Sequence, residues 1–282
     1  MGQVFGELLL GSVAHLMVYD RDGERVEVLA RRGATPASGV RDFAHCEVVL
    51  TSLPDDDVVR AVVLSDSGLV SVLRPGSIHL STSTIGVAFC RESDAAHRKL
   101  DQTLVAMPVL GNPDMAAKRE LFILLGGPTE AIERCRPVTE HLGQRSFHVG
   151  EMPWVASAMK LACNMLTAAT LESMGEAFAF LEKVGVPPER AQEILTGSLF
   201  DGHVHKAYGQ KIVTRRYTPP GMTAPLATKD LRLLLAEAEH NNVPMPVASL
   251  LHDRLVAVQA RGWSELDWSA LGLLAAFEAG IP

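Results

Sequence analysis

The sequence is poor in several features that define particular protein classes. Only four of its 282 residues are cysteines, and Cys46, Cys90, Cys135 and Cys163 are far apart with no CxxC pair. This spacing favours free thiols in a reducing cytoplasm over a disulfide framework or a zinc site. No run approaches the roughly 18 apolar residues of a membrane span, and the opening MGQVFGELLLGSVAH has no basic segment. These absences predict a cytoplasmic protein that neither enters nor crosses a membrane.

Basic residues are also too few and too scattered to form a stripe. The chain has 26 Lys and Arg against 33 Asp and Glu, which gives a formal net charge of −7. This balance argues against nucleic acid and anionic membranes as partners. With 47% hydrophobic and 21% charged residues, the composition is that of a folded globular protein with ample core.

The first half of the chain alternates short β-rich runs with amphipathic stretches. Such alternation predicts an α/β domain with a mainly parallel sheet. Asp55 or Asp56 suits the N-cap of the helix that follows the second run. The expected strands are 15–20, 46–53, 77–82, 102–108, 120–127 and 145–150, and the expected helices are 21–32, 55–64, 86–99 and 128–142.

After about residue 150 the pattern becomes helical throughout. Between Pro153 and Lys183 there is one glycine and no internal proline, and apolar residues recur at helical spacing. Pro153 suits the first position of a helix. Further helices are expected over 228–242, 246–262 and 266–280. The sequence therefore predicts two domains, 1–150 and 151–282, of which the second is all-helical and is joined to the first by one long helix.

Lys160 is the only charged residue between Met152 and Leu171. Burying an ammonium fully is costly unless it is paired or functional. Asn164 follows by four residues, so both side chains project from one face of the expected helix. The pair suits a proton donor beside a hydrogen-bonding anchor, but a lysine whose ammonium reaches water would give the same pattern. The pattern alone leaves both readings open.

Six short motifs, in order and at matching spacing, resemble the β-hydroxyacid dehydrogenase family, to which 3-hydroxyisobutyrate dehydrogenase belongs. The resemblance covers essentially the whole chain. It implies a Rossmann domain that binds NAD or NADP, an all-α C-terminal domain, and hydride transfer that interconverts a small-molecule carbonyl compound and its alcohol. The motifs are VYDR at 18–21, TSLPDD at 51–56, STSTI at 81–85, MPVLGNPDMA at 107–116, KLACN at 160–164 and KD at 229–230.

The resemblance also assigns catalytic and substrate roles. It implies that Lys160 transfers the proton while hydride moves, and that Asn164 anchors the substrate. An ammonium suits this task because it stabilises the negative charge that develops on oxygen and then donates the proton. Phe200 and Tyr208 are expected to line the substrate cleft or to pack a subunit contact. A homodimer or higher homo-oligomer is expected through the helical half.

Cofactor contacts are implied at Leu53 and Pro54, at Thr84 beside the nicotinamide ribose, and at Lys229. Two further residues stand at the end of the run at 15–20, namely Asp20, which is its last residue, and Arg21, which follows it. Asp20 is placed to accept hydrogen bonds from the adenosine ribose 2′-hydroxyl, whereas Arg21 could hold a 2′-phosphate. These residues favour opposite cofactors, so the preference between NAD and NADP stays open.

The chain departs from the family in its substrate loop. The family's serine and two glycines are replaced by Leu110, Gly111 and Asn112, which predicts a larger or less polar carbonyl substrate than a small hydroxy acid. The related imine reductases also lack that loop, but they generally replace the catalytic lysine, so Lys160 argues against this alternative. His203 and His205 are too sparse for a metal site without further ligands.

The second departure lies at the start. The family's first strand and glycine-rich turn, G-x-G-x-x-G, are represented only by Gly2, which resembles the third glycine. We expect the first strand to be missing and dinucleotide binding to be poor. A start codon assigned too late would explain this departure. The other interpretation is a truncated chain that is a non-catalytic binding or oligomerisation module.

Overall fold

Short apolar strands build the sheet of the first part of the chain. The computed structural model describes residues 1–282, which form two units, Met1–Lys160 and Leu161–Pro282. The larger sheet of the first unit has the strand order β3-β4-β5-β7-β6, and β8 also pairs with β7. Its strands are β3 (Val48–Thr51), β4 (Ile78–Ser81), β5 (Thr103–Ala106), β6 (Val109–Leu110), β7 (Phe122–Gly126) and β8 (Arg145–Gly150).

Three of the five pairings in this sheet are parallel, as the predicted mainly parallel sheet requires, but the direction of β7 adds two antiparallel pairings that the sequence did not predict. β3, β4 and β5 run parallel to one another, while β7 is antiparallel to β5 and β6 and parallel to β8. A strand antiparallel to its neighbour has the same alternation of apolar residues as a parallel one. The sequence pattern therefore cannot give the strand direction.

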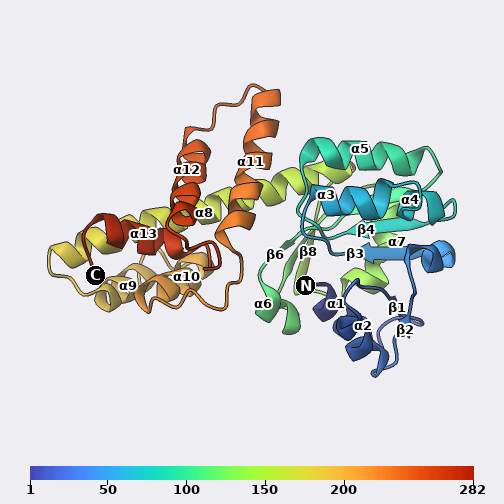
Figure 1. Cartoon of the computed structure of the whole chain (residues 1–282), viewed down its shortest axis with the longest axis horizontal. Helices are drawn as coiled ribbons and strands as arrows, with labels where there is room; N and C mark the ends of the chain where they lie inside the picture. The colour runs from blue at the N-terminus through green and yellow to red at the C-terminus, as the bar shows by residue number, and fades with distance from the viewer. The chain divides into compact units, whose positions relative to one another are not determined.

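The two faces of the sheet pack against different helices because successive strand residues point to opposite sides. Ile78 and Leu80 belong to one core, with helices α1 (Gly2–Leu9), α6 (Pro113–Ala117) and α7 (Thr129–Thr139). Val49 and Leu104 belong to the other core. This second face is covered by α3 (Asp56–Val59), η2 (Arg60–Leu64), α4 (Leu69–Val72) and α5 (Val87–Arg98), next to η1 (Val40–His45) (Figure 1).

The helix expected over 55–64 begins as its N-cap signal predicts. Asp55 is the N-cap of α3, and its Oδ1 accepts a hydrogen bond of 2.9 Å from the backbone N–H of Val58. The α-helical part is short, because the backbone continues from Arg60 to Leu64 as a π-helical turn. Asp55, rather than Asp56, is therefore the capping residue.

The run at 15–20 forms a shorter strand than expected and does not join the larger sheet. β1 (Met17–Val18) pairs in parallel with β2 (Thr35–Pro36), and the two strands form a separate sheet (Figure 1). Helix α2 (Gly23–Ala30) connects them in the sequence. The sequence did not predict β2 or β6. Each has only two residues, which is too short to display a period-two pattern.

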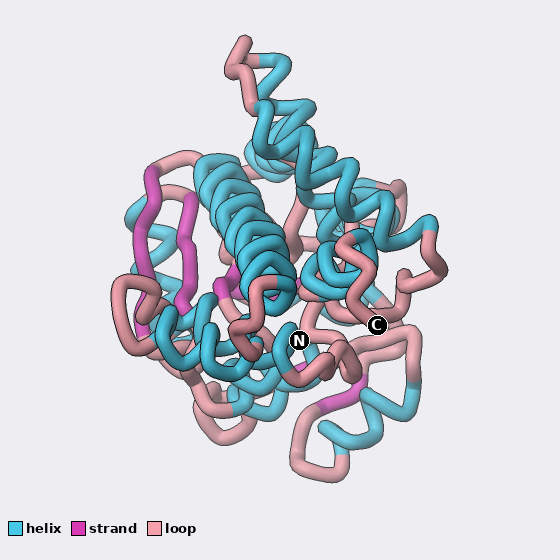
Figure 2. The backbone as a smooth tube through the Cα atoms, turned by 90° about the vertical axis from the view of Figure 1, so that its left-hand side faces the viewer, coloured by secondary structure: helices cyan, strands magenta, loops and turns pink.

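The second unit is entirely helical, as the sequence predicted. The long helix α8 (Pro153–Lys183) begins at Pro153, and helices and loops alternate to the end of the chain (Figure 2). Leu171, Leu231, Leu255 and Trp268 lie in its main core. No helix of the chain is long and apolar enough to cross a membrane. The remaining helices are α9 (Pro188–Thr196), α10 (His203–Val213), α11 (Ala224–His240), α12 (Pro246–Ala260) and α13 (Ala270–Glu278).

Candidate functional site

The carboxyl ends of β3 and β4 are joined by a set of hydrogen bonds. The backbone N–H and the hydroxyl of Thr82 both donate to the carbonyl of Thr51, at 2.9 Å each. The backbone N–H of Leu53 donates to the hydroxyl of Ser83 at 3.0 Å. Ligands of α/β proteins bind at the carboxyl ends of parallel strands. The loop at 52–54 is therefore held in position where a ligand would be expected.

Gly2 lies beside this loop. A Cβ added to Gly2 would lie 3.4 Å from the Cβ of Ser52. Gly2 is the first residue of α1, whose N-terminal amides are capped by no side chain. Uncapped N–H groups at a helix N-terminus bind phosphate well. The structure thus brings Gly2 and the loop carrying Leu53 and Pro54 together, and Thr84 follows β4 at the same edge of the sheet.

Asp20 and Arg21 lie immediately after β1. The Oδ1 of Asp20 accepts a hydrogen bond of 2.9 Å from the backbone N–H of Asp22, and its Oδ2 lies 3.8 Å from the Arg25 guanidinium. Asp20 is half-buried and Arg21 is exposed. The Asp20 carboxylate is therefore oriented by its neighbours, while the Arg21 side chain faces solvent.

In the loop at 110–112, two residues have structural tasks. Gly111 has φ of +136°, and an added Cβ would lie 2.5 Å from a Leu121 methyl carbon, so a side chain fits neither the backbone nor the space. Asn112 is the N-cap of α6, where its Oδ1 accepts from the N–H of Met115 at 2.9 Å. Sequence reasoning missed this cap, although Asn followed by Pro at the first helical position signals it.

Asn164 is held by a residue of the KD motif at 229–230 to which the sequence analysis gave no role. Its Nδ2 donates to Oδ2 of Asp230 at 2.6 Å, and the Lys229 ammonium lies 3.1 Å from the other carboxylate oxygen. Asn164 is 7% exposed and Asp230 3%. Asp230 thus orients two of the predicted site residues at once. Lys160 is half-buried, one turn before Asn164 on α8.

The two predicted aromatic residues have different surroundings. Phe200 is partly exposed, with its ring 5.6 Å from that of His205. Tyr208 packs edge-to-face on Trp268 at 5.9 Å, and burial raises the pKa of its hydroxyl to about 12, so it stays neutral at physiological pH. Neither His203 nor His205 belongs to a group of three or more His, Cys, Asp or Glu side chains that could hold a metal, because the structure has no such group.

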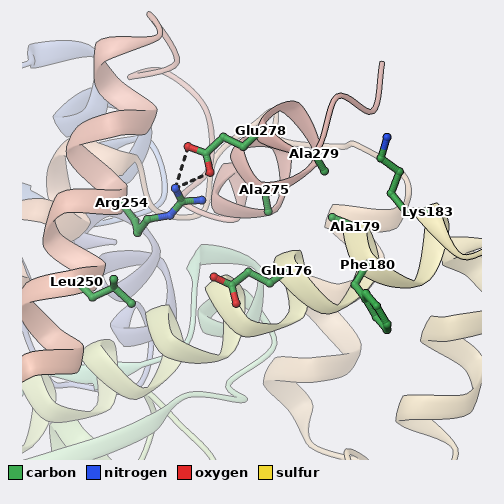
Figure 3. Close-up of a pocket in the computed structure, with 9 residues that line it drawn as sticks. All are labelled: Glu176, Ala179, Phe180, Lys183, Leu250, Arg254, Ala275, Glu278 and Ala279. Carbon is green, nitrogen blue, oxygen red and sulfur yellow. Dashed lines mark hydrogen bonds and ion pairs between the residues drawn. The ribbon is translucent and has the colours of Figure 1, made fainter.

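A hollow of about 500 Å³ lies on the helical unit. It is formed by α8, α12 and α13, and its polar lining includes the Arg254–Glu278 pair (Figure 3). None of the residues predicted to bind cofactor or substrate lines it. We therefore treat the sheet edge of the first unit and the group around Asn164 in the second as two separate candidate regions, neither of which includes this hollow.

The residues at the sheet edge fit a dinucleotide. The uncapped N-terminus of α1 suits a pyrophosphate, and the side chain of Asp20 suits a ribose hydroxyl. The loop at 52–54, which is held by the hydrogen bond from Leu53 to Ser83, lies beside Gly2 at this edge. In the helical unit, Asn164, Lys229 and Asp230 form a buried polar group suited to a small polar ligand.

Comparisons with known proteins show the family to which the chain belongs. The family described as the NAD binding domain of 6-phosphogluconate dehydrogenase matches residues 1–150. The family described as NAD-binding of NADP-dependent 3-hydroxyisobutyrate dehydrogenase matches residues 155–274. An uncharacterized oxidoreductase of Bacillus subtilis, YfjR, is 36% identical over 96% of this chain and 95% of its own.

Two further relatives have named activities. The NAD-dependent L-serine dehydrogenase of Pseudomonas aeruginosa is 30% identical over 96% of this chain and 93% of its own. The solved structure of Mycobacterium tuberculosis 3-hydroxyisobutyrate dehydrogenase with L-serine superposes with a TM-score of 0.87 at 24% identity, covering 97% of this chain and 95% of that one. The chain therefore belongs to the β-hydroxyacid dehydrogenase family of NAD(P)-dependent oxidoreductases.

Proposed function

We propose that this NAD(P)-dependent oxidoreductase interconverts a small-molecule carbonyl compound and its alcohol, with Lys160 as the proton donor and acceptor. The observation that supports it is the arrangement on α8. Lys160 is half-buried one turn from Asn164, whose amide is held by the buried carboxylate of Asp230. A charged group next to an oriented amide is what a polar reaction centre needs.

In the proposed reaction the reduced nicotinamide, when bound, supplies the hydride that adds to the carbonyl carbon. The carbonyl π bond breaks, and its electron pair moves to oxygen. Lys160 stabilises this negative charge and gives its proton to the oxygen, which completes the alcohol. Asn164 donates a hydrogen bond that orients the substrate. In the reverse direction neutral Lys160 accepts the hydroxyl proton while hydride leaves the carbon.

The substrate loop supports a proposal about substrate class. The backbone at Gly111 is constrained and the Oδ1 of Asn112 is engaged as an N-cap. The Asn112 amide is then the donor that this loop offers, and Leu110 adds an apolar surface. Such a loop is better suited to a larger or less polar carbonyl compound than to a small hydroxy acid. L-serine, the substrate in the name of one relative, is the small polar compound to compare it with.

The alternative of an imine-reductase-like enzyme shares the hydride donor but not the proton donor. Lys160 favours carbonyl reduction, because an ammonium supplies the proton that an alkoxide requires. The non-catalytic alternative makes a different prediction, since a binding module would take up no reduced dinucleotide. Measurements of dinucleotide binding and of turnover distinguish both alternatives from the proposal.

The experiment that tests the proposal combines binding with turnover. Titration of the protein with NADH and NADPH, followed by tryptophan fluorescence, gives the affinity for each. Oxidation of the bound dinucleotide is then followed at 340 nm with aldehydes and ketones of increasing size, and with cyclic imines. Turnover of a carbonyl compound supports the proposal, whereas turnover of imines alone, or no dinucleotide binding, contradicts it.

The two residues after β1 are proposed to set the cofactor preference. Replacing Arg21 with alanine is expected to weaken NADPH binding about tenfold or more and to leave NADH binding unchanged, if its guanidinium pairs with the 2′-phosphate. Replacing Asp20 with alanine is instead expected to relax discrimination against NADPH, because the carboxylate repels that phosphate. Dissociation constants for both cofactors check this, and equal values in all three proteins would show that neither residue contacts the ribose.

We also propose that the protein acts as a homodimer through its helical unit, in the cytoplasm. Large apolar side chains are exposed on two of its helices, with Leu166 63% and Phe180 66% exposed on α8 and Leu250 54% on α12. Exposed apolar surface of this kind favours association between subunits. None of the four cysteines forms a disulfide, which suits a reducing compartment. Light scattering on the purified protein gives its mass in solution, and a monomer at micromolar concentration would contradict the dimer.

A further inference from the structure

A row of hydrogen-bonded polar side chains, most of them buried, lies on the face of the sheet that α5 covers. The hydroxyl of Thr51 lies 2.8 Å from Nε2 of His79, and Nδ1 of His79 lies 2.9 Å from Nε2 of His97. Nδ1 of His97 lies 2.9 Å from Oε1 of Gln102. The two histidines and Gln102 are almost fully buried. Such groups replace apolar side chains at a cost in stability, so the arrangement calls for an explanation.

The side chain of Gln102 determines which atom is the donor in every hydrogen bond of this row. Nε2 of Gln102 lies 2.9 Å from the carbonyl oxygen of Val70 and 2.7 Å from that of Leu73. Two carbonyl oxygens require a donor between them, so the amide nitrogen, not its oxygen, is at this position. The Gln102 oxygen is then an acceptor, and the hydrogen on His97 must be on Nδ1.

The remaining protons are placed by the same reasoning. Burial lowers the pKa of His97 and lowers that of His79 well below its usual range, so both rings are neutral near pH 7. A neutral ring with its proton on Nδ1 accepts at Nε2. His97 therefore accepts from Nδ1–H of His79, and His79 accepts at Nε2 from the hydroxyl of Thr51. The Thr51 hydroxyl has one direction in which all these bonds are made.

Thr51 connects this row of hydrogen-bonded side chains to the candidate site. It ends β3, and the loop at 52–54 follows it directly. Its carbonyl accepts from Thr82, so its backbone is tied to β4 and its side chain to His79. Ser52 lies next to Gly2. A change in the rotamer of Thr51 would shift the start of this loop.

We propose that His79 and His97 form a one-directional hydrogen-bond relay, from Thr51 to Gln102, that positions the loop at 52–54 for dinucleotide binding. These are positioning residues, because none of them is argued to touch the reacting atoms. The proposal rests on the proposed function in one respect only, which is that the loop contacts the cofactor. The relay itself depends on no ligand.

The relay is tested by nitrogen-15 NMR of the histidine rings in the full-length protein near pH 7. Both His79 and His97 are expected as neutral Nδ1–H tautomers, which the chemical shifts of the two ring nitrogens distinguish directly. On saturation with NADH, the ring signals of His79 are expected to shift, while those of the exposed His240 stay unchanged. An Nε2–H tautomer at either buried ring would overturn the relay.

The positioning role is tested with a matched pair of variants. Thr51→Val keeps the shape and removes the donor, so its dissociation constant for NADH is expected to rise about tenfold, with kcat at saturating cofactor nearly unchanged. Thr51→Ser keeps the hydroxyl and is expected to retain the affinity of the original protein. A purely structural role would not be rescued in this way while kcat stays constant.

The outcomes separate the two proposals. Unchanged affinity in folded Thr51→Val overturns the positioning role. If that variant does not fold, an unshifted His79 signal on NADH saturation of the unmodified protein overturns it instead. Failure of the unmodified protein to bind either dinucleotide would overturn the proposed function and the positioning role together, while two Nδ1–H tautomers would still confirm the relay.

Discussion

Replacing Lys160 with alanine is expected to lower kcat at least about a hundredfold, which is the range for losing a general acid. The side chain is half-buried on α8, one turn from the oriented amide of Asn164. Without its ammonium, the negative charge that develops on the substrate oxygen would have to be stabilised by water. Steady-state rates with a carbonyl substrate, together with the dissociation constant for NADH, check this result.

The helix offers a matched control for this variant. Lys183 ends α8 and its side chain is exposed, so Lys183→Ala removes the same atoms from the same helix without touching the proposed reaction centre. It is expected to keep its full rate. Unchanged affinity for NADH in the Lys160 variant would place the loss in the chemical step. An alanine variant at position 160 with an undiminished rate would remove Lys160 from the mechanism.

Local pattern was enough to predict the elements that have a strong period or a strong stop signal. α8 was predicted because no internal proline interrupts its apolar residues, and it begins at Pro153 as expected. The strands of the larger sheet other than β6 were predicted because most of them carry a run of β-branched or aliphatic residues. β1 was predicted too long, and it lies with β2 in a separate sheet. Tertiary contacts determine which strands pair, and a six-residue run of sequence does not indicate those contacts.

The site was harder to predict than the fold because its polar contacts join residues far apart in sequence. Lys160 and Asn164 were singled out as candidates because two polar residues stand out in an apolar helix. Asp230, which holds the Asn164 amide, comes 66 residues later, and a lone Asp in a helix is usually exposed. His79 and His97 are a further example. Nothing in either local pattern indicates that Nδ1 of His79 lies 2.9 Å from Nε2 of His97.

Replacing Arg254 with alanine is expected to lower the free energy of unfolding by about 3–5 kcal/mol, the cost of breaking a buried ion pair from one side. Its Nε donates to Oε1 of Glu172 at 2.5 Å, and its Nη1 donates to both carboxylate oxygens of Glu278 at 2.9 and 2.7 Å (Figure 3). Glu172 is 4% exposed, and its Oε2 has no hydrogen-bond partner. Without Arg254 this carboxylate would be buried with no positive charge beside it.

The loss is expected to depend on pH, and its sign follows from Glu172. Burial raises the pKa of this carboxyl, and the positive charge of Arg254 partly offsets that effect. Removing Arg254 therefore raises the pKa further in the folded state. Between the unfolded value of about 4.3 and the raised folded value, the folded protein binds more protons than the unfolded chain, so its stability falls as pH rises. The variant should be closest to the original protein near pH 5 and furthest from it near pH 8.

Urea unfolding of the two proteins at both pH values measures this difference, and two further variants identify its source. In a Glu172→Gln background, where a neutral amide replaces the carboxylate, Arg254→Ala should lose the same free energy of unfolding at both pH values. Glu278→Ala removes the more exposed partner of Arg254, and its cost should be near that of a surface ion pair, up to about 1 kcal/mol. If Arg254→Ala loses the same free energy at pH 5 and pH 8, then the substitution does not raise the pKa of Glu172, and this carboxylate is solvated in the variant. Its buried charge would then not be what Arg254 stabilises.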